Sequence, residues 1–150
     1  MGTAPRECVL CGLVAGRLPA SVVHKDDDII VLMDIRPVTP GHLMVVPTAH
    51  VPRLADLSRE VGSLIFEWAR IASMALYQSD LRPGGLNLFL SDGEVAMQEI
   101  NHLHLHLIPR YENDGFGLVM PNVYKQFPER AELDRHAELI RSGVISTSGA

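Results

Sequence analysis

Residues 102–109 read HLHLHLIP, an alternation in which every second side chain is an imidazole and the side chains between them are apolar. Successive side chains of a β-strand point to opposite faces of its sheet, so the pattern predicts a strand over residues 101–108 that Pro109 ends. We expect the leucines on one face of this strand and the imidazoles on the other. The row of imidazoles consists of His102, His104 and His106.

This row has three interpretations. A half-buried strand can carry histidine on its solvent face without any chemistry, but only 7 of 150 residues are histidine, so three at alternate positions is an uncommon coincidence. A three-histidine metal site needs nitrogens that converge on one ion, whereas alternate positions on a strand lie roughly 6 to 7 Å apart. Nucleophilic catalysis at phosphorus fits better, because neutral imidazole keeps one nitrogen free near pH 7 and its neighbours can hold its tautomer.

Around this strand, the chain predicts further short strands and a long helix. Apolar residues recur at three- and four-residue steps over residues 58–78, after the good helix cap Ser58, which predicts an amphipathic helix covering one face of a sheet. A helical turn at residues 8–15 and a C-terminal helix at 128–141 are also predicted. Apolar segments bounded by turn residues predict strands at 21–24, 29–33, 43–47 and 86–90.

The element order favours an α+β protein with an antiparallel sheet, because the links between strands are short. A chain of 150 residues with 47% hydrophobic composition can bury one ordinary core. We therefore expect a single domain over residues 1–141. Residues 142–150 are small and polar, which predicts a disordered tail.

Composition excludes two classes of partner. The net charge is −5 and only two lysines occur, Lys25 and Lys125, so no basic face for nucleic acid is expected. No apolar run approaches the roughly 18 residues of a membrane helix, and the opening MGTAPRE has no hydrophobic signal core. These features predict a cytoplasmic protein without a membrane or nucleic-acid partner.

The motif HLHLHLIP resembles the His-x-His-x-His-x-x motif of the histidine triad (HIT) family, in which x is mostly apolar. The segment from Asp26 through DIRPVTPGH at 34–42 to His50 is similar to the upstream half of that family, and DGFG at 114–117 is similar to a loop of bacterial members. The resemblance covers about residues 8–117. It implies a HIT-like fold, an antiparallel five-stranded sheet with a long central helix and a C-terminal helix, and a homodimer.

The same resemblance implies roles for individual residues. His104 would be the nucleophile that attacks the α-phosphorus of a nucleotide and carries a transient nucleotidyl group, which water then releases as a nucleoside monophosphate. His106 would hydrogen-bond a nonbridging oxygen, and Gln98 would contact the phosphate or the leaving group. Asp34 would bind ribose hydroxyls, although a residue of this type also fits a turn at the end of a strand. For His42, a packed position and a position lining the ligand cleft both remain open.

The implied substrate is a purine nucleoside 5′-phosphate derivative, such as an AMP phosphoramidate, an acyl adenylate or a dinucleoside polyphosphate. Three residues depart from the family pattern. Met97 stands where many members have Gly, Ser91 where Asn often approaches the phosphate, and Glu99 where some branches have Ser or Thr. These departures leave the identity of the leaving group open.

Cys8 and Cys11 form a CxxC pair, which is typical of a metal half-site, a redox motif or a disulfide framework. Two thiolates are half of a tetrahedral zinc site. The resemblance to zinc-bearing bacterial HIT proteins points to His50 and His102 as the other two ligands, and it implies a structural zinc with no catalytic metal required. The alternative is a pair of reduced cysteines in a core turn.

Two other functions compete with the enzyme. One is a nucleotide-binding regulatory protein with little or no turnover, which the departure at Met97 keeps open. The other is a metal-storage or metal-sensing protein that uses the three histidines of the row together with Cys8 and Cys11.

Overall fold

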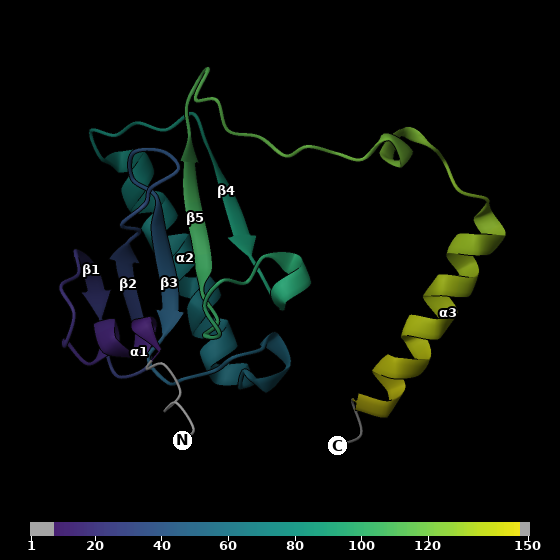
Figure 1. Ribbon diagram of the computed structural model, residues 1–150, viewed down its shortest axis with the longest axis horizontal. Helices are drawn as coiled ribbons and strands as arrows, with labels where there is room; N and C mark the ends of the chain where they lie inside the picture. The colour runs from purple at the N-terminus through teal and green to yellow at the C-terminus, as the bar shows by residue number, and fades with distance from the viewer. Residues whose placement is uncertain (1–7, 148–150) are drawn as a thin grey trace, which may run out of the picture. The chain divides into compact units, whose positions relative to one another are not determined.

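The computed structural model describes residues 8–147, and the chain divides into two compact units, Met1–Phe116 and Gly117–Ala150 (Figure 1). The described part of the first unit forms a five-stranded sheet in the order β1-β2-β3-β5-β4, and every neighbouring pair is antiparallel. The strands are β1 (Val22–Lys25), β2 (Ile29–Met33), β3 (Leu43–Pro47), β4 (Gly85–Leu90) and β5 (Leu105–Arg110).

Three α-helices and three short 3-10 helices complete the described residues. Among them, no helix is long and apolar enough to cross a membrane. The α-helices are α1 (Val9–Val14), α2 (Arg59–Gln78) and α3 (Arg130–Thr147), and the 3-10 helices are η1 (Leu54–Asp56), η2 (Glu94–Ala96) and η3 (Asn122–Lys125). The α+β class, the antiparallel five-stranded sheet and the long and C-terminal helices are thus confirmed.

Strands β2 and β3 are buried on both faces, which explains why their sequences are apolar without interruption. Figure 1 shows α2 running along one side of the sheet, and α1 packs on the other. The first core joins α2 to Ile29, Val31, Leu43 and Val45, and the second joins Leu10 to Ile30, Leu32, Met44 and Val46. Alternating residues of the central strands therefore belong to two different cores.

Helix α2 begins where the sequence predicts it. The Ser58 hydroxyl accepts a hydrogen bond from the Val61 N–H at 3.2 Å, which satisfies one of the unpaired amides at the helix start. The buried side chains of α2 recur at helical spacing and face the sheet: Ile65, Ala69, Ala72 and Leu76.

The prediction of a strand over residues 101–108 is wrong at both ends. Strand β5 begins at Leu105, so His102 and His104 precede it. The backbone there turns instead, with the His102 N–H donating to the Ile100 carbonyl at 2.8 Å. Pro109 lies inside β5, beyond the last residue that pairs with β3, Leu107, so its missing N–H breaks no hydrogen bond to β3.

The C-terminal helix also ends later than predicted. Helix α3 runs to Thr147, whereas the sequence predicts its end at residue 141 and a tail after it. Small hydroxyl side chains remain compatible with the helix because they bond to carbonyls one turn back, as Ser142 does to Glu138 and Thr147 to Gly143. Residues 148–150 of the predicted tail lie outside the described residues, and the single domain over 1–141 remains a prediction.

Candidate active site and metal cluster

Three adjacent strands bring the candidate catalytic residues together on the side of the sheet opposite α2. Leu105 and Leu107 of β5 pack in the core with α2, so His106 between them faces the other side, where it pairs with Met44 of β3. His42 immediately precedes β3, and Asp34 immediately follows β2. The Asp34 N–H donates to the His42 carbonyl at 3.1 Å, which extends the pairing of β2 and β3 by one step.

His104 is held in one tautomer by the backbone. Its Nδ1–H donates to the His102 carbonyl at 2.7 Å, because a carbonyl oxygen can only accept. The neutral ring then has its lone pair on Nε2. Only 9% of the His104 residue is exposed, so the ring that carries this lone pair is largely buried.

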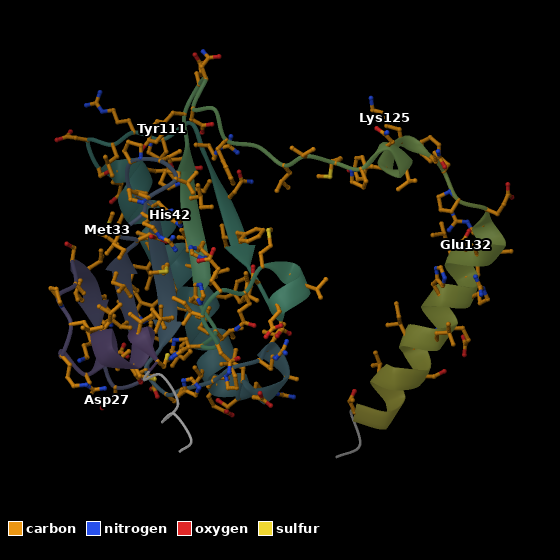
Figure 2. All side chains as sticks on the ribbon, in the orientation of Figure 1. Asp27, Met33, His42, Tyr111, Lys125 and Glu132 are labelled. Atoms are coloured by element: carbon orange, nitrogen blue, oxygen red, sulfur yellow. The ribbon has the colours of Figure 1, made fainter. Side chains whose placement is uncertain are left out.

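His42 and His106 are ordered by a second hydrogen-bond chain (His42 is labelled in Figure 2). The Val38 N–H donates to His42 Nδ1 at 3.1 Å, so the neutral His42 ring carries its proton on Nε2. That N–H donates to His106 Nδ1 at 2.9 Å, which leaves the His106 proton on Nε2. The His106 ring centroid is 4.8 Å from that of His104, so a nitrogen donor stands beside a nitrogen nucleophile.

Burial keeps these rings neutral. Burial, together with the positive charges that His104 and His42 would carry, lowers the pKa of His106 to about 4, although Asp34 opposes the shift. Burial also lowers the pKa of His42. At pH 7 both rings are therefore uncharged, as the chain of donors and acceptors requires.

Asp34, His42 and His106 place their ligand atoms within 4.8 Å of one another, a spacing that a metal ion can bridge. The hydrogen bond from Val38 argues against a metal here, because His42 with its lone pair on Nδ1 presents a proton and not a lone pair to the site. Asp34 Oδ2 lies 3.7 Å from both ring nitrogens, beyond hydrogen-bond distance. The three residues form a polar wall rather than a metal centre.

Gln98 fixes the loop that precedes His102 by two hydrogen bonds. Its Oε1 accepts from the Gly93 N–H at 2.7 Å and its Nε2 donates to the Pro52 carbonyl at 2.9 Å. These bonds occupy the amide oxygen and one of the two amide protons. The contact of Gln98 with a phosphate remains a prediction.

Met97 adopts the left-handed conformation that glycine favours, with φ +64°, and its side chain is 71% exposed. Glu99 forms an exposed ion pair with Arg36 at 3.0 Å, which links this loop to the segment after β2. Ser91, by contrast, is buried. The family departures at Met97 and Glu99 thus lie on the surface of a loop adjacent in sequence to the histidines.

Cys8, Cys11, His50 and His102 form a second cluster, with all four ligand atoms within 4.8 Å of one another. His102 Nδ1 lies 3.5 Å from each sulfur, and His50 Nδ1 lies 3.3 Å from the sulfur of Cys11. In a tetrahedral zinc site with ordinary bond lengths, sulfur and nitrogen are separated by about 3.5 Å. The donor set and its spacing therefore fit zinc.

The second ring nitrogen of His102 supports the same fit. Nε2–H donates to the Pro47 carbonyl at 2.9 Å, which leaves the lone pair on Nδ1, the atom that faces the sulfurs. Ring orientation by a carbonyl behind the ligand is usual in zinc sites. The His102 ring is completely buried between these partners.

His42 is the site residue whose role the sequence leaves open. Its position before β3 gives no sign of chemistry, because its partner His106 lies 64 residues further along the chain. Only the β3–β5 pairing shows that the two rings meet.

Comparison with known proteins agrees with this geometry. The family model of the HIT domain matches residues 15–113. "Protein hit" of Bacillus subtilis is 34% identical over 113 residues, which cover 75% of this chain and 77% of that protein. A solved HIT family protein from Bacillus anthracis shares the fold with a TM-score of 0.84 at 34% identity, over 93% of this chain and 99% of that one.

A Zn-bound histidine triad family protein from Mycobacterium smegmatis has a TM-score of 0.70 at 30% identity, and the match covers 94% of this chain and 97% of that one. The matched residues include the row of histidines and the segment from Asp34 to His50. This chain therefore belongs to the histidine triad family.

Proposed function

We propose that this protein is a nucleotide hydrolase or transferase that cleaves at the α-phosphorus of a nucleoside 5′-phosphate derivative. One observation carries the proposal: the His102 carbonyl holds the Nδ1–H of His104, so that Nε2 carries the lone pair of a largely buried ring. Membership of the HIT family supports the same kind of reaction.

In the first step, His104 Nε2 attacks the α-phosphorus. A P–N bond forms, and the bond from phosphorus to the leaving group breaks with its electron pair on the leaving group. In the second step, water attacks the same phosphorus, the P–N bond breaks, and a nucleoside monophosphate leaves. The water protons are shared between the products and solvent.

His106 supports the transition state of both steps. Its Nε2–H, set by the hydrogen bond from His42, is placed to donate to a nonbridging oxygen on which negative charge accumulates. Because the pKa of His106 is lowered, its ring stays neutral near pH 7 and keeps the tautomer with the proton on Nε2.

Asp34 is the proposed contact for the ribose hydroxyls. Its Oδ1 accepts the Arg36 N–H at 2.8 Å, which holds the carboxylate in place with Oδ2 toward the histidines. An AMP derivative is the proposed substrate, and phosphoramidates, acyl adenylates and dinucleoside polyphosphates are the candidate classes.

We further propose a structural zinc on Cys8, Cys11, His50 and His102. Four protein ligands close a tetrahedral site, so the metal would stabilise the fold without supplying a reactive water. We also propose that the reaction itself requires no catalytic metal. A cytoplasmic location fits this proposal, because thiol ligands persist in a reducing compartment.

A homodimer is the proposed assembly. Phe66, Met74 and Tyr77 are 65%, 49% and 51% exposed on the side of α2 away from the sheet. Strand β4 ends the sheet order, so among the described residues one of its edges is unpaired. A second copy of the chain would cover both features by a two-fold interface.

Replacing His104 with Ala should abolish the covalent intermediate and lower kcat by about 10⁴-fold, because the attacking nitrogen is lost. Brief mixing with an adenosine phosphoramidate, an acyl adenylate and a diadenosine polyphosphate, followed by mass spectrometry of the histidine peptides, measures the intermediate. His136→Ala, at an exposed position on α3, is the control and should behave as wild type. Nucleotide binding without any turnover by the wild type would favour the regulatory protein instead.

Replacing His42 with Phe should lower kcat by about 10- to 100-fold with a smaller change in KM, because a ring of similar size no longer donates to His106 Nδ1. Steady-state kinetics on the best substrate of the panel measures the split. His24→Phe on β1 is the matched control, since His24 stacks on Trp68 and a phenyl ring can do the same. Wild-type kcat in His42→Phe would contradict the proton order derived above.

Purified wild-type protein should contain about one zinc per chain, and a chelator should lower its Tm, because the metal binds the folded state. Cys8→Ser should lose most of the metal and have a low Tm from the start. Elemental analysis and thermal unfolding measure both effects, with His136→Ser as the control. Zinc-free wild type, purified without chelators, together with an unchanged Tm in Cys8→Ser would rule out the site.

Met74→Lys should convert the dimer to a monomer, since a charge at this exposed position of α2 would be buried in the interface beside the like charge of Arg70, which lies 3.3 Å from Met74 Sδ. Sedimentation equilibrium of the full chain measures the mass. Ala75→Lys adds the same charge at an exposed position of the same helix, about 100° around the axis from Met74, and should leave the dimer intact. A monomeric wild type would contradict the proposed assembly.

A further inference from the structure

His102 connects the two clusters through different atoms. Its ring Nδ1 lies 3.5 Å from the sulfurs of Cys8 and Cys11, and its backbone carbonyl accepts the His104 Nδ1–H at 2.7 Å. The same residue is therefore a candidate metal ligand and the group that sets the tautomer of the proposed nucleophile. Any change that moves the His102 backbone also moves the acceptor of His104.

The backbone of residues 102–104 lies outside the paired part of β5. Strand β5 begins at Leu105, and its pairing with β3 and with β4 begins there as well. Between His102 and His104, the Leu103 N–H donates to the Val51 carbonyl at 2.7 Å, and Val51 lies in the segment that carries His50. The direction of the His102 carbonyl thus depends on the buried His102 ring, which the Pro47 carbonyl holds through Nε2 and the two thiols hold through Nδ1.

The thiols that anchor the ring come from the far end of the sequence. Cys8 lies 94 residues before His102, immediately before α1, and Cys11 lies in the first turn of α1. Both are partly exposed, whereas His102 is completely buried. Two cysteines spaced as CxxC at the start of a helix can also form a disulfide with each other. Solvent oxidants can therefore reach the two sulfurs, although the His102 ring between them is buried.

We infer that the Cys8–Cys11 pair is a redox control point for nucleotidyl transfer, acting through His102 as a positioning residue. The inference rests on the proposed function and adds a regulation to it. Oxidation by a peroxide removes two electrons from the thiolates and joins the two sulfurs. The O–O bond of the peroxide is reduced to two hydroxide or alkoxide ions, and the metal leaves as a divalent cation.

Release of His102 slows the chemical step and spares nucleotide binding. Without the metal, His102 Nδ1 loses its partners and the carbonyl no longer holds His104 in a single tautomer. The binding groups lie on other supports: Asp34 accepts from the Arg36 N–H, and His42 accepts from the Val38 N–H and donates to His106. A general loss of structure would weaken binding as well, so the two effects can be separated.

The test uses the zinc-loaded full chain treated with hydrogen peroxide, with disulfide formation followed by mass spectrometry and zinc release by a chelating dye. We expect single-turnover nucleotidylation of His104 to fall about 10- to 100-fold, while the Kd for AMP changes less than about twofold. The ¹⁵N spectrum of the His104 ring should change from one tautomer to a mixture. Dithiothreitol with added zinc should restore all three properties.

Cys8→Ser/Cys11→Ser is the matched control, and it should start at the slow rate and not respond to peroxide. Failure of the disulfide to form, an unchanged rate after it forms, or a parallel loss of AMP affinity and circular dichroism would overturn the inference. If reduced, zinc-loaded protein transfers no nucleotidyl group to His104, the proposed function fails. The His104 spectrum and AMP affinity still test the link from the thiols to His104 in that case.

Discussion

The hydrogen bond from His104 Nδ1–H to the His102 carbonyl is the contact on which the proposed chemistry depends. Imidazole has two nitrogens, and only the one that lacks the proton can attack phosphorus. A backbone carbonyl is a suitable partner because it can accept a hydrogen bond and never donate one.

The second constraint is that the imidazole rings of the site are buried and must therefore stay neutral. Between them, the two cores bury both faces of β2 and β3, and this places His42 and His106 at the edge of a dry region. Desolvation disfavours the charged imidazolium, so each buried ring must find hydrogen bonds as a neutral group. The hydrogen-bond chain meets this requirement, because the Val38 N–H donates to His42 Nδ1 and the His42 Nε2–H donates to His106 Nδ1. Among the described residues, no fully buried side-chain nitrogen or oxygen lacks a hydrogen-bond partner.

Hydrophobic patterning of the strands and the helix cap at Ser58 predict most of the secondary structure, because these signals depend on residues that are close in sequence. Strands β2 and β3 and the start of α2 at Ser58 agree with the sequence to the residue, since continuous apolar runs and a cap hydroxyl act within a few positions. The histidine row is less well predicted. Alternation begins at residue 102, but the backbone joins the sheet only at Leu105, and before that the Leu103 N–H donates to the Val51 carbonyl.

The sequence by itself determined the two donor sets: a CxxC pair, and histidines at alternate positions whose resemblance to a known motif indicated chemistry at phosphorus. Only the tertiary structure decided which atoms meet, because Cys8 and His102, or His42 and His106, are separated by more than 60 residues. Strand pairing and the packing of α1 close these distances, and hydrogen bonds to carbonyl and amide groups then set each tautomer. The sequence specifies the residue types. Which ring nitrogen of each histidine carries the proton depends on a hydrogen-bond partner that only folding brings into contact.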